Sequence, residues 1–286
     1  MIPSPKQAPK GTAMNDTTLK TRFGPTALVT GASEGIGRAL AEALAAEGLD
    51  LILVARRAAV LEGLATDLAA QHGVAVRVHT MDLGQPGAVA ALLSATQADE
   101  IGLLIAAAGF GSIGPFLERD PEAEAAMIDL NCRAVVGLAH GLGARMAVRG
   151  RGGMMLFGSL VGFQGAPNAA TYAATKGFVQ SFGEALAVEL RGRGVHVLTL
   201  APGPVMSGFA GRAGMQLGPA DRPEVVARDA LAALGRRAHS RPGLVGKALG
   251  WSLATAPRAL RVRIMGQIMH GLIRKNDTPA KAGAAR

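Results

Sequence analysis

Two residues of types that are rare in this chain stand one helical turn apart. Tyr172 is the only tyrosine among 286 residues, and Lys176 is the only lysine between Lys20 and Lys247. On a helix, positions four apart share a face. A nearby ammonium favours the charged form of a phenol, so the pair is a candidate acid and base for carbonyl chemistry. The alternative is chance placement on an amphipathic helix.

Two further polar residues could join this pair. Ser159 comes just after an apolar segment, residues 153–157, that we expect to be a strand. Ligands of open α/β sheets bind at the carboxyl ends of strands, so the Ser159 hydroxyl is placed to polarise a substrate carbonyl. Asn131 falls inside a predicted helix, where an amide is not a favoured residue. Simple exposure to solvent is the alternative explanation for Asn131.

A glycine-rich turn, TGASEGIG at residues 30–37, links the first predicted strand to a helix. Glycines at Gly31, Gly35 and Gly37 allow the backbone to approach a pyrophosphate, and the helix N-terminus supplies free N–H groups. A merely tight turn is the alternative. The position of the turn, after the first strand of a βαβ series, favours a dinucleotide site.

The end of the second predicted strand indicates which nucleotide would bind. An NAD site usually has an acidic residue there, whereas this chain has VARR at residues 54–57. A guanidinium can form two hydrogen bonds to a 2′-phosphate, so we expect NADP rather than NAD. Arg56 is the first choice for this contact and Ser33 a second. The alternative is a pair of solvated arginines at the start of a helix.

Short apolar segments alternate with alanine-rich helical segments over most of the chain, which predicts a doubly wound, Rossmann-type parallel sheet of the α/β class in a single domain. The predicted strands are residues 26–30, 51–55, 74–79, 102–107, 153–157 and 195–200, and the predicted helices are 36–47, 58–71, 86–96, 121–149, 170–190 and 224–234. We expect the domain to cover residues 23–240, between a disordered leader at 1–22 and a basic helical C-terminal extension at 241–286.

The composition excludes several classes of protein. Hydrophobic residues make up 49% and charged residues 18%, which excludes disorder as the main state. Aromatic residues are only 3%, so we expect no nucleic-acid partner. The single cysteine, Cys132, cannot form an intrachain disulfide, and no apolar run is long enough to span a membrane. We expect a cytoplasmic protein without a metal site.

The net charge of +9 is concentrated at the C-terminus, where residues 236–286 hold eleven Lys and Arg and a single acid, Asp277. A helical stretch after Pro257 has an apolar face formed by Ile264, Met265, Ile268, Met269, Leu272 and Ile273. A basic amphipathic helix can bind a membrane surface. It can equally close over a substrate pocket or pack on a partner subunit.

Together these motifs resemble those of the short-chain dehydrogenase/reductase family, over about residues 26–238. The positions that match family motifs are Gly31, Gly35, Ile36 and Gly37 in the glycine-rich turn, Asn131, Ser159, Tyr172 and Lys176 in the catalytic set, and Asp82, Leu83, Ala108, Gly109, Pro202, Gly203, Val205 and Ser207 among the other cofactor contacts.

The resemblance implies NADP(H)-dependent interconversion of an alcohol and a ketone or aldehyde, and it also implies a homo-oligomer. In such an enzyme Tyr172 donates the proton, and Lys176 orients the nicotinamide ribose and lowers the tyrosine pKa. Ser159 aligns the carbonyl, and Asn131 supports a water relay. A dinucleotide-binding sensor without turnover and a lipid-surface reductase are the alternatives. The intact catalytic set favours an enzyme, and the small-molecule substrate is left open.

One motif departs from the family pattern. Residues 106–109 read AAAG where the family usually has Asn-Asn-Ala-Gly, which predicts a weaker connection between neighbouring strands. Ser207 also replaces a commoner threonine. Five loop residues predict an apolar substrate pocket: Phe110, Phe163, Met206, Phe209 and Met215.

Overall fold

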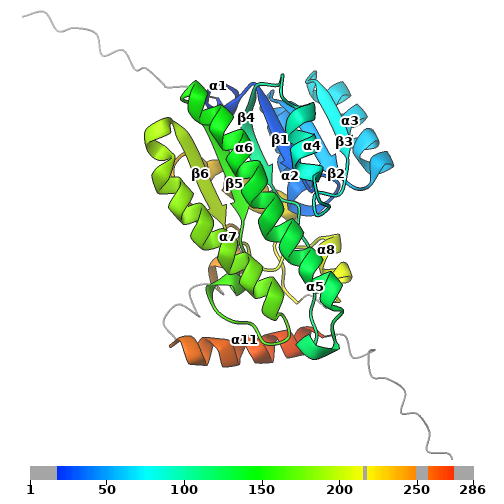
Figure 1. The fold of residues 1–286 in the computed structure, drawn as a ribbon, viewed down its shortest axis with the longest axis vertical. Coiled ribbons are helices and arrows are strands. Elements are labelled where there is room, and N and C mark those ends of the chain that lie inside the picture. Colours follow the sequence, from blue (N-terminus) through cyan, green and yellow to red (C-terminus); the bar gives the residue numbers. More distant parts are fainter. Residues whose placement is uncertain (1–17, 215–217, 249–256, 274–286) are drawn as a thin grey trace, which may run out of the picture.

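The computed structural model describes residues 18–214, 218–248 and 257–273. Its centre is one parallel sheet of seven strands in the order β3-β2-β1-β4-β5-β6-β7 (Figure 1). The strands are β1 (Thr26–Thr30), β2 (Asp50–Ala55), β3 (Val76–Thr80), β4 (Ile101–Ala106), β5 (Gly152–Phe157), β6 (Val195–Leu200) and β7 (His239–Ser240). The predicted doubly wound Rossmann-type fold is confirmed.

Helices cover both faces of the sheet. The first face carries α2 (Gly35–Ala46), α3 (Ala58–His72) and α9 (Pro223–Ala233), and the second carries α4 (Ala88–Ala95), α6 (Ala134–Arg149) and α7 (Ala170–Glu189). Side chains of a strand alternate between faces, so Val29 joins the core of the first face while Leu28 joins the core of the second. Burial on both faces explains the nearly continuous apolar runs in the sequence.

The start of the domain differs from the prediction. Residues 18–22 were expected to belong to a disordered leader, but α1 (Leu19–Phe23) is a helix whose N-terminal N–H group at Thr21 bonds to the Thr18 hydroxyl. Phe23 is fully buried and packs into the first core, with Leu19 beside it. Burial of these two side chains stabilises a segment whose polar neighbours suggested a loop. Residues 1–17 lie outside the described residues.

Three elements were not predicted as the structure has them. The segment predicted as one helix, residues 121–149, is α5 (Pro121–Ile128) and α6 joined by a π-helical turn at Asp129–Arg133. The short strand β7 has only two residues, so the sequence contains no apolar run that would predict it. The loop after β6, where a short helix was only a possibility, contains α8 (Gly208–Arg212).

The carboxyl ends of the central strands bring the predicted site residues to one edge of the sheet. At the last residue of β1, Thr30 pairs with Val54 of β2 and with Ala106 of β4. The glycine-rich turn after β1 therefore lies between two other segments at this edge. These are the arginines after β2 on one side and the AAAG segment after β4 on the other. Ser159 comes two residues after β5 in the same layer of loops.

The C-terminal helix α11 (Arg258–Leu272) crosses the molecule beside the N-terminal end of α7 (Figure 1). Met265 and Met269 are its buried residues, whereas Ile268 is exposed. Within the described ranges no helix combines the length and the apolar character that crossing a membrane requires. Most of the basic extension predicted for 241–286 falls in the ranges 249–256 and 274–286, outside the described residues.

Candidate active site

The glycine-rich turn forms a cradle in which side chains would not fit. Gly31 has a φ of 67°, and a Cβ there would lie 2.9 Å from the backbone of Ala108. A Cβ on Gly37 would lie 2.4 Å from the carbonyl oxygen of Gly31. Helix α2 begins at Gly35 without a side-chain cap, which leaves its first N–H groups open to an anion. These residues fit the pyrophosphate of a dinucleotide.

The structure puts Arg57, rather than Arg56, over the glycine-rich turn. The Arg57 Nη2 atom donates to the Ser33 hydroxyl at 3.0 Å, to the Ser33 carbonyl at 3.1 Å and to Glu34 at 2.9 Å. Arg56 extends toward Asp82, with 3.9 Å between charged atoms, and its side chain is 66% exposed. Arg57 therefore lies at Ser33, where a 2′-phosphate would bind, while Arg56 points to Asp82. Arg56 was predicted to contact the phosphate, and Arg57, the next residue, was not.

Glu34 joins two loops of the site. Its carboxylate accepts hydrogen bonds from Arg57 and from Arg212 in α8, the helix after β6. These two arginines, with the Arg212 hydrogen bond as the largest contribution, hold the pKa of Glu34 below its usual value. The ion pairs therefore connect the glycine-rich turn to the loop that follows the sixth strand.

Tyr172 and Lys176 lie on the first turns of α7 and are both buried. The Lys176 Nζ atom is 5.8 Å from the centre of the Tyr172 ring and donates a 2.8 Å hydrogen bond to the carbonyl oxygen of Phe157, at the end of β5. The Ser159 hydroxyl lies near enough to Tyr172 to lower its pKa, while its own oxygen accepts from the N–H of Val161 at 3.4 Å. The structure thus brings together three of the four predicted catalytic residues around the end of β5.

Burial shifts both ionisable groups of the pair toward their neutral forms. It raises the pKa of Tyr172 to about 12, although the nearby Ser159 hydroxyl acts in the opposite direction. It lowers the pKa of Lys176 to about 8. The expected depression of the tyrosine pKa by Lys176 is not found in the protein alone, because desolvation outweighs the ammonium at this separation. At neutral pH the phenol keeps its proton.

Asn131, the fourth predicted catalytic residue, is buried in the π-helical turn between α5 and α6. Its amide accepts from the N–H of Phe110 at 3.1 Å and donates to the Phe110 carbonyl at 2.8 Å and to the Thr175 hydroxyl at 3.1 Å. The π turn interrupts the regular helical spacing at the residue that faces the site. Asn131 therefore fixes the segment after β4 against α7, and its part in a water relay stays a prediction.

Thr30 supplies a connection where the AAAG segment lacks side-chain amides. Its hydroxyl, at the end of β1, donates to the carbonyl of Ile105 at 3.3 Å and accepts from the N–H of Ala108 at 3.0 Å. Gly109 then passes close to the catalytic set, since a Cβ there would lie 2.9 Å from the Asn131 amide oxygen. The weaker connection predicted from residues 106–109 is compensated by the neighbouring strand.

The segment from Pro202 to Ser207 lies between the two halves of the site. The Pro202 carbonyl accepts from the N–H of Leu160, next to Ser159, and a Cβ on Gly35 would lie 3.1 Å from the Cβ of Ser207. Val205 forms an isolated bridge to Asp221, which anchors the segment from the outside. The family motif implies that residues 202–207 contact the nicotinamide end of a cofactor, and their position in the structure fits that contact.

A small apolar cluster surrounds Tyr172. Its buried members are Ile113, Met127, Ala166, Ala169, Tyr172 and Ala173, together with Met265 and Met269 of α11. Phe110 and Phe209 pack against this cluster, and the Phe209 ring is centred 5.6 Å from that of Tyr172. An apolar environment was predicted here, whereas the contribution of α11 was one of three alternatives.

Phe163 and Met206, two of the predicted pocket residues, do not belong to this cluster. Phe163 turns toward β7, where it packs edge-on against His239 and under the guanidinium of Arg241, so its assignment to the pocket was wrong. Met206 is 50% exposed. Met215 falls outside the described residues. A phenylalanine four residues after Ser159 could have faced either side, because the intervening turn is 3-10 rather than helical.

The fold and the loops at its carboxyl edge place the protein among dinucleotide-binding enzymes of the Rossmann type. A family model described as short chain dehydrogenase matches residues 25–216. The chain is 31% identical over 189 residues to a 7beta-hydroxysteroid dehydrogenase of Collinsella aerofaciens, covering 66% of this chain and 72% of that protein. It is 37% identical over 184 residues to a very-long-chain 3-oxoacyl-CoA reductase of Phaeosphaeria nodorum, covering 61% of this chain and 54% of that longer protein.

Solved structures agree with these relatives. A short-chain dehydrogenase from Sphingobium yanoikuyae, in complex with NADPH, superposes with a TM-score of 0.73 at 34% identity, covering 91% of this chain and 98% of that one. The protein belongs to the short-chain dehydrogenase family and is an NAD(P)-dependent oxidoreductase that interconverts alcohols and ketones.

Proposed function

We propose that the protein is an NADPH-dependent reductase of an apolar carbonyl compound. The observation that carries this proposal is a buried Tyr172 whose pKa is about 12 and which is enclosed by apolar side chains. A phenol that keeps its proton at neutral pH is ready to donate it to a carbonyl oxygen. The same residue would need to lose that proton before it could oxidise an alcohol, so reduction is favoured at neutral pH.

The residues of the chain divide the chemistry among them. Tyr172 donates the proton to the substrate oxygen, and the Ser159 hydroxyl holds that oxygen within reach of the phenol. Lys176 is fixed by its bond to Phe157 and presents its ammonium beside the tyrosine. Asn131 keeps the segment at Phe110 in place. A bound nicotinamide supplies the hydride that this proton transfer accompanies.

The nucleotide preference rests on the corner formed by Ser33, Arg56 and Arg57. The Arg57 guanidinium in contact with Ser33, a second arginine next to it in the sequence and the absence of a carboxylate at residues 54–57 favour a 2′-phosphate over a free ribose hydroxyl. The NADPH complex of the similar enzyme from Sphingobium yanoikuyae supports the same choice. Arg57 contacts Ser33, and Arg56 is the arginine expected from the sequence to bind the phosphate. We propose that both arginines bind it.

We propose that α11 covers the substrate pocket. Met265 and Met269 are buried in the cluster that contains Tyr172, which favours covering over lying on a membrane. Flexible thioether side chains fit apolar substrates of irregular shape. Removal of the residues after Pro257 should then raise the KM for a bulky ketone without changing location. Co-sedimentation with anionic vesicles that the truncation abolishes would instead favour the membrane alternative.

We also propose that the protein forms a homo-oligomer. Val136 on α6 and Phe178 and Val188 on α7 are exposed apolar side chains, with 75% of Val188 accessible. Helices with exposed apolar residues are common sites of self-association. Light scattering after gel filtration tests this proposal, and substitution of Phe178 by Asp should favour the monomer. A cytoplasmic location stays a prediction.

Tyr172→Phe tests the proposed function most directly. The variant keeps the ring and its packing but loses the transferable proton, so ketone reduction should fall by about 10²- to 10⁴-fold. Binding of NADPH, measured by fluorescence titration, should stay within about three-fold of wild type, because the ring is retained. Retention of more than about a tenth of the activity would show that another group donates the proton.

The same experiment separates an enzyme from a dinucleotide-binding sensor. A sensor would bind NADPH in both wild type and variant without consuming it in the presence of any ketone. Bulky apolar ketones form the first panel, because the cluster around Tyr172 is apolar and lies under α11. Consumption of NADPH by wild type alone supports the proposal.

A further inference from the structure

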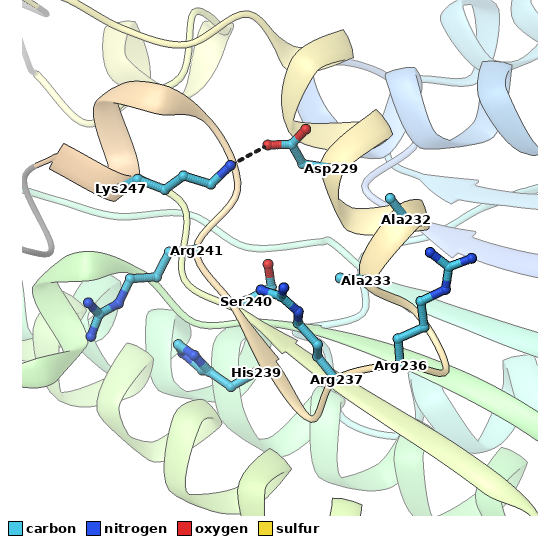
Figure 2. A pocket seen from close by; sticks show the side chains of 9 residues that line it. All are labelled: Asp229, Ala232, Ala233, Arg236, Arg237, His239, Ser240, Arg241 and Lys247. Atoms are coloured by element: carbon cyan, nitrogen blue, oxygen red, sulfur yellow. Dashed lines mark hydrogen bonds and ion pairs between the residues drawn. The ribbon is translucent and has the colours of Figure 1, made fainter.

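A groove with a volume of about 640 Å³ lies along β7 and shares no lining residue with the candidate active site (Figure 2). One wall is the C-terminal half of α9, and the rest comes from the segment between Arg236 and Lys247. Four cationic side chains line it, namely Arg236, Arg237, Arg241 and Lys247, against one carboxylate, Asp229. The groove therefore has an excess of positive charge.

Most of this charge is not neutralised within the described part of the chain. Asp229 pairs with Lys247 at 3.1 Å and with Arg228 at 3.2 Å, and it also accepts the N–H of Gly243. Among the described residues, neither Arg236 nor Arg237 has a carboxylate within 4.0 Å. Arg241 has no carboxylate partner among these residues either, so three of the four cations are left without an ion pair, and only Lys247 has one.

The directions of the side chains distinguish the members of the groove. Arg241 stacks on Phe163, 4.6 Å from the ring centre, and its guanidinium turns away from the other residues in Figure 2. The guanidinium of Arg237 reaches toward the middle of the groove, and Lys247 extends toward Asp229 at the opposite side. Arg237 and Lys247 are therefore the cations placed to bind one ligand from two sides.

Two simpler explanations cover only part of this arrangement. Arg236 and Arg237 follow the C-terminus of α9, where cations interact favourably with the helix dipole, but Lys247 lies outside that end of the helix. A second copy of the chain could pair along β7, which is the last strand of the sheet. Such a twofold interface would bring four cations and one carboxylate from each copy into contact, and it would therefore bury an excess of positive charge.

We propose that this groove binds a phosphate-bearing small molecule of about nucleotide size. Guanidinium groups bind phosphate oxygens in pairs, and an ammonium adds a point charge. The volume lies within the range of about 300 to 1,000 Å³ that is usual for small-molecule sites. Ala232 and Ala233 form the helical wall, so no long side chain fills the space beside the cations. The site is independent of the proposed reductase activity.

Titration calorimetry on the protein saturated with NADP tests this proposal at low salt, because the cofactor then occupies the other phosphate site. Inorganic pyrophosphate and coenzyme A are the two probes. We expect one site per chain for at least one probe, with an affinity that falls as salt is added. Equal affinities mean recognition of phosphate alone, while tighter binding of coenzyme A means that its organic part also occupies the groove.

Three variants decide where the probe binds. Arg237→Glu and Lys247→Glu should each weaken binding at least ten-fold. The matched control, Arg193→Glu, makes the same charge change at an exposed site outside the groove and should leave the affinity within two-fold. Folding is checked by circular dichroism, and NADP binding of the variants should match wild type. A failure of NADP to bind would count against the reductase proposal alone.

Several results would overturn the groove proposal. The first is that neither pyrophosphate nor coenzyme A binds. The second is that a probe binds with the same affinity to wild type and to both groove variants. Phosphatidylglycerol vesicles form the last arm of the experiment. Vesicle binding that the two groove variants abolish, without binding of either soluble probe, would assign the groove to lipid headgroups and reject a small-molecule ligand.

Discussion

Replacement of Lys176 by methionine should make the stability of the protein less dependent on pH. The side chain is buried, and its pKa falls from the reference value of 10.5 to about 8. In the unfolded chain the same group keeps its reference value. The folded state therefore binds fewer protons than the unfolded state between pH 8 and 10.5, and the free energy of unfolding rises with pH in that window.

The magnitude follows from the difference between the two pKa values. At about 1.36 kcal/mol per pKa unit, the burial of the ammonium costs about 3 kcal/mol below pH 8, and this cost disappears near pH 10.5. Methionine has a similar length and no charge to bury. Loss of the hydrogen bond to the Phe157 carbonyl, worth about 1 kcal/mol, is an opposing effect that shifts the difference equally at every pH.

Urea unfolding followed by circular dichroism, without added nucleotide, measures this effect at pH 7.5 to 10.5. Wild type should gain about 3 kcal/mol relative to Lys176→Met over that range, because all other titrations are common to both chains. The exposed Lys20 provides the control, and Lys20→Met should follow wild type. Parallel curves for wild type and Lys176→Met would refute the reasoning, since they would mean that Lys176 carries its charge at no cost.

The remaining predictions concern activity, the cofactor and the strands. Reduction requires a protonated Tyr172 and a charged Lys176, so kcat/KM should be level below pH 8 and should fall about ten-fold per pH unit above it; a level profile to pH 10 would contradict this. Arg56→Asp and Arg57→Asp should each weaken NADPH binding by about 10- to 100-fold, with NAD binding spared, as calorimetry can measure; unchanged NADPH affinity in both would place the phosphate elsewhere. Thr30→Val should lower the free energy of unfolding by about 1 to 3 kcal/mol in urea, and no change would mean that the hydrogen bonds to Ile105 and Ala108 are replaced.

The fold was readable from the sequence where burial on both faces of the sheet produces long apolar runs. Six strands follow from such runs, but β7 has two residues and depends on the neighbouring β6 for its existence. The π turn at Asn131 was not readable either, because one inserted residue per turn leaves the helical pattern on both sides intact. Local sequence also could not reveal that Phe23 is anchored in the core.

The sequence predicted which residues form the site more completely than it predicted their pKa values and contacts. Tyr172, Lys176 and Ser159 meet because the motif spacing corresponds to one strand end and one helix start. The upward shift of the tyrosine pKa depends on the apolar cluster, which includes residues nearly a hundred positions away in α11. The position of Arg57 over Ser33 depends on the direction in which the chain leaves β2, and a pair of adjacent arginines does not specify it.

The two ion pairs of Glu34 have a consequence for protein engineering. Arg57 and Arg212 share one carboxylate, so a change at the nucleotide corner alters the charge balance at the loop after β6. A variant designed to exchange NADPH for NADH at Arg57 would leave Glu34 with Arg212 as its only partner among the described residues. Cofactor exchange in this enzyme should therefore be accompanied by a change in substrate KM, and the two properties are best optimised together.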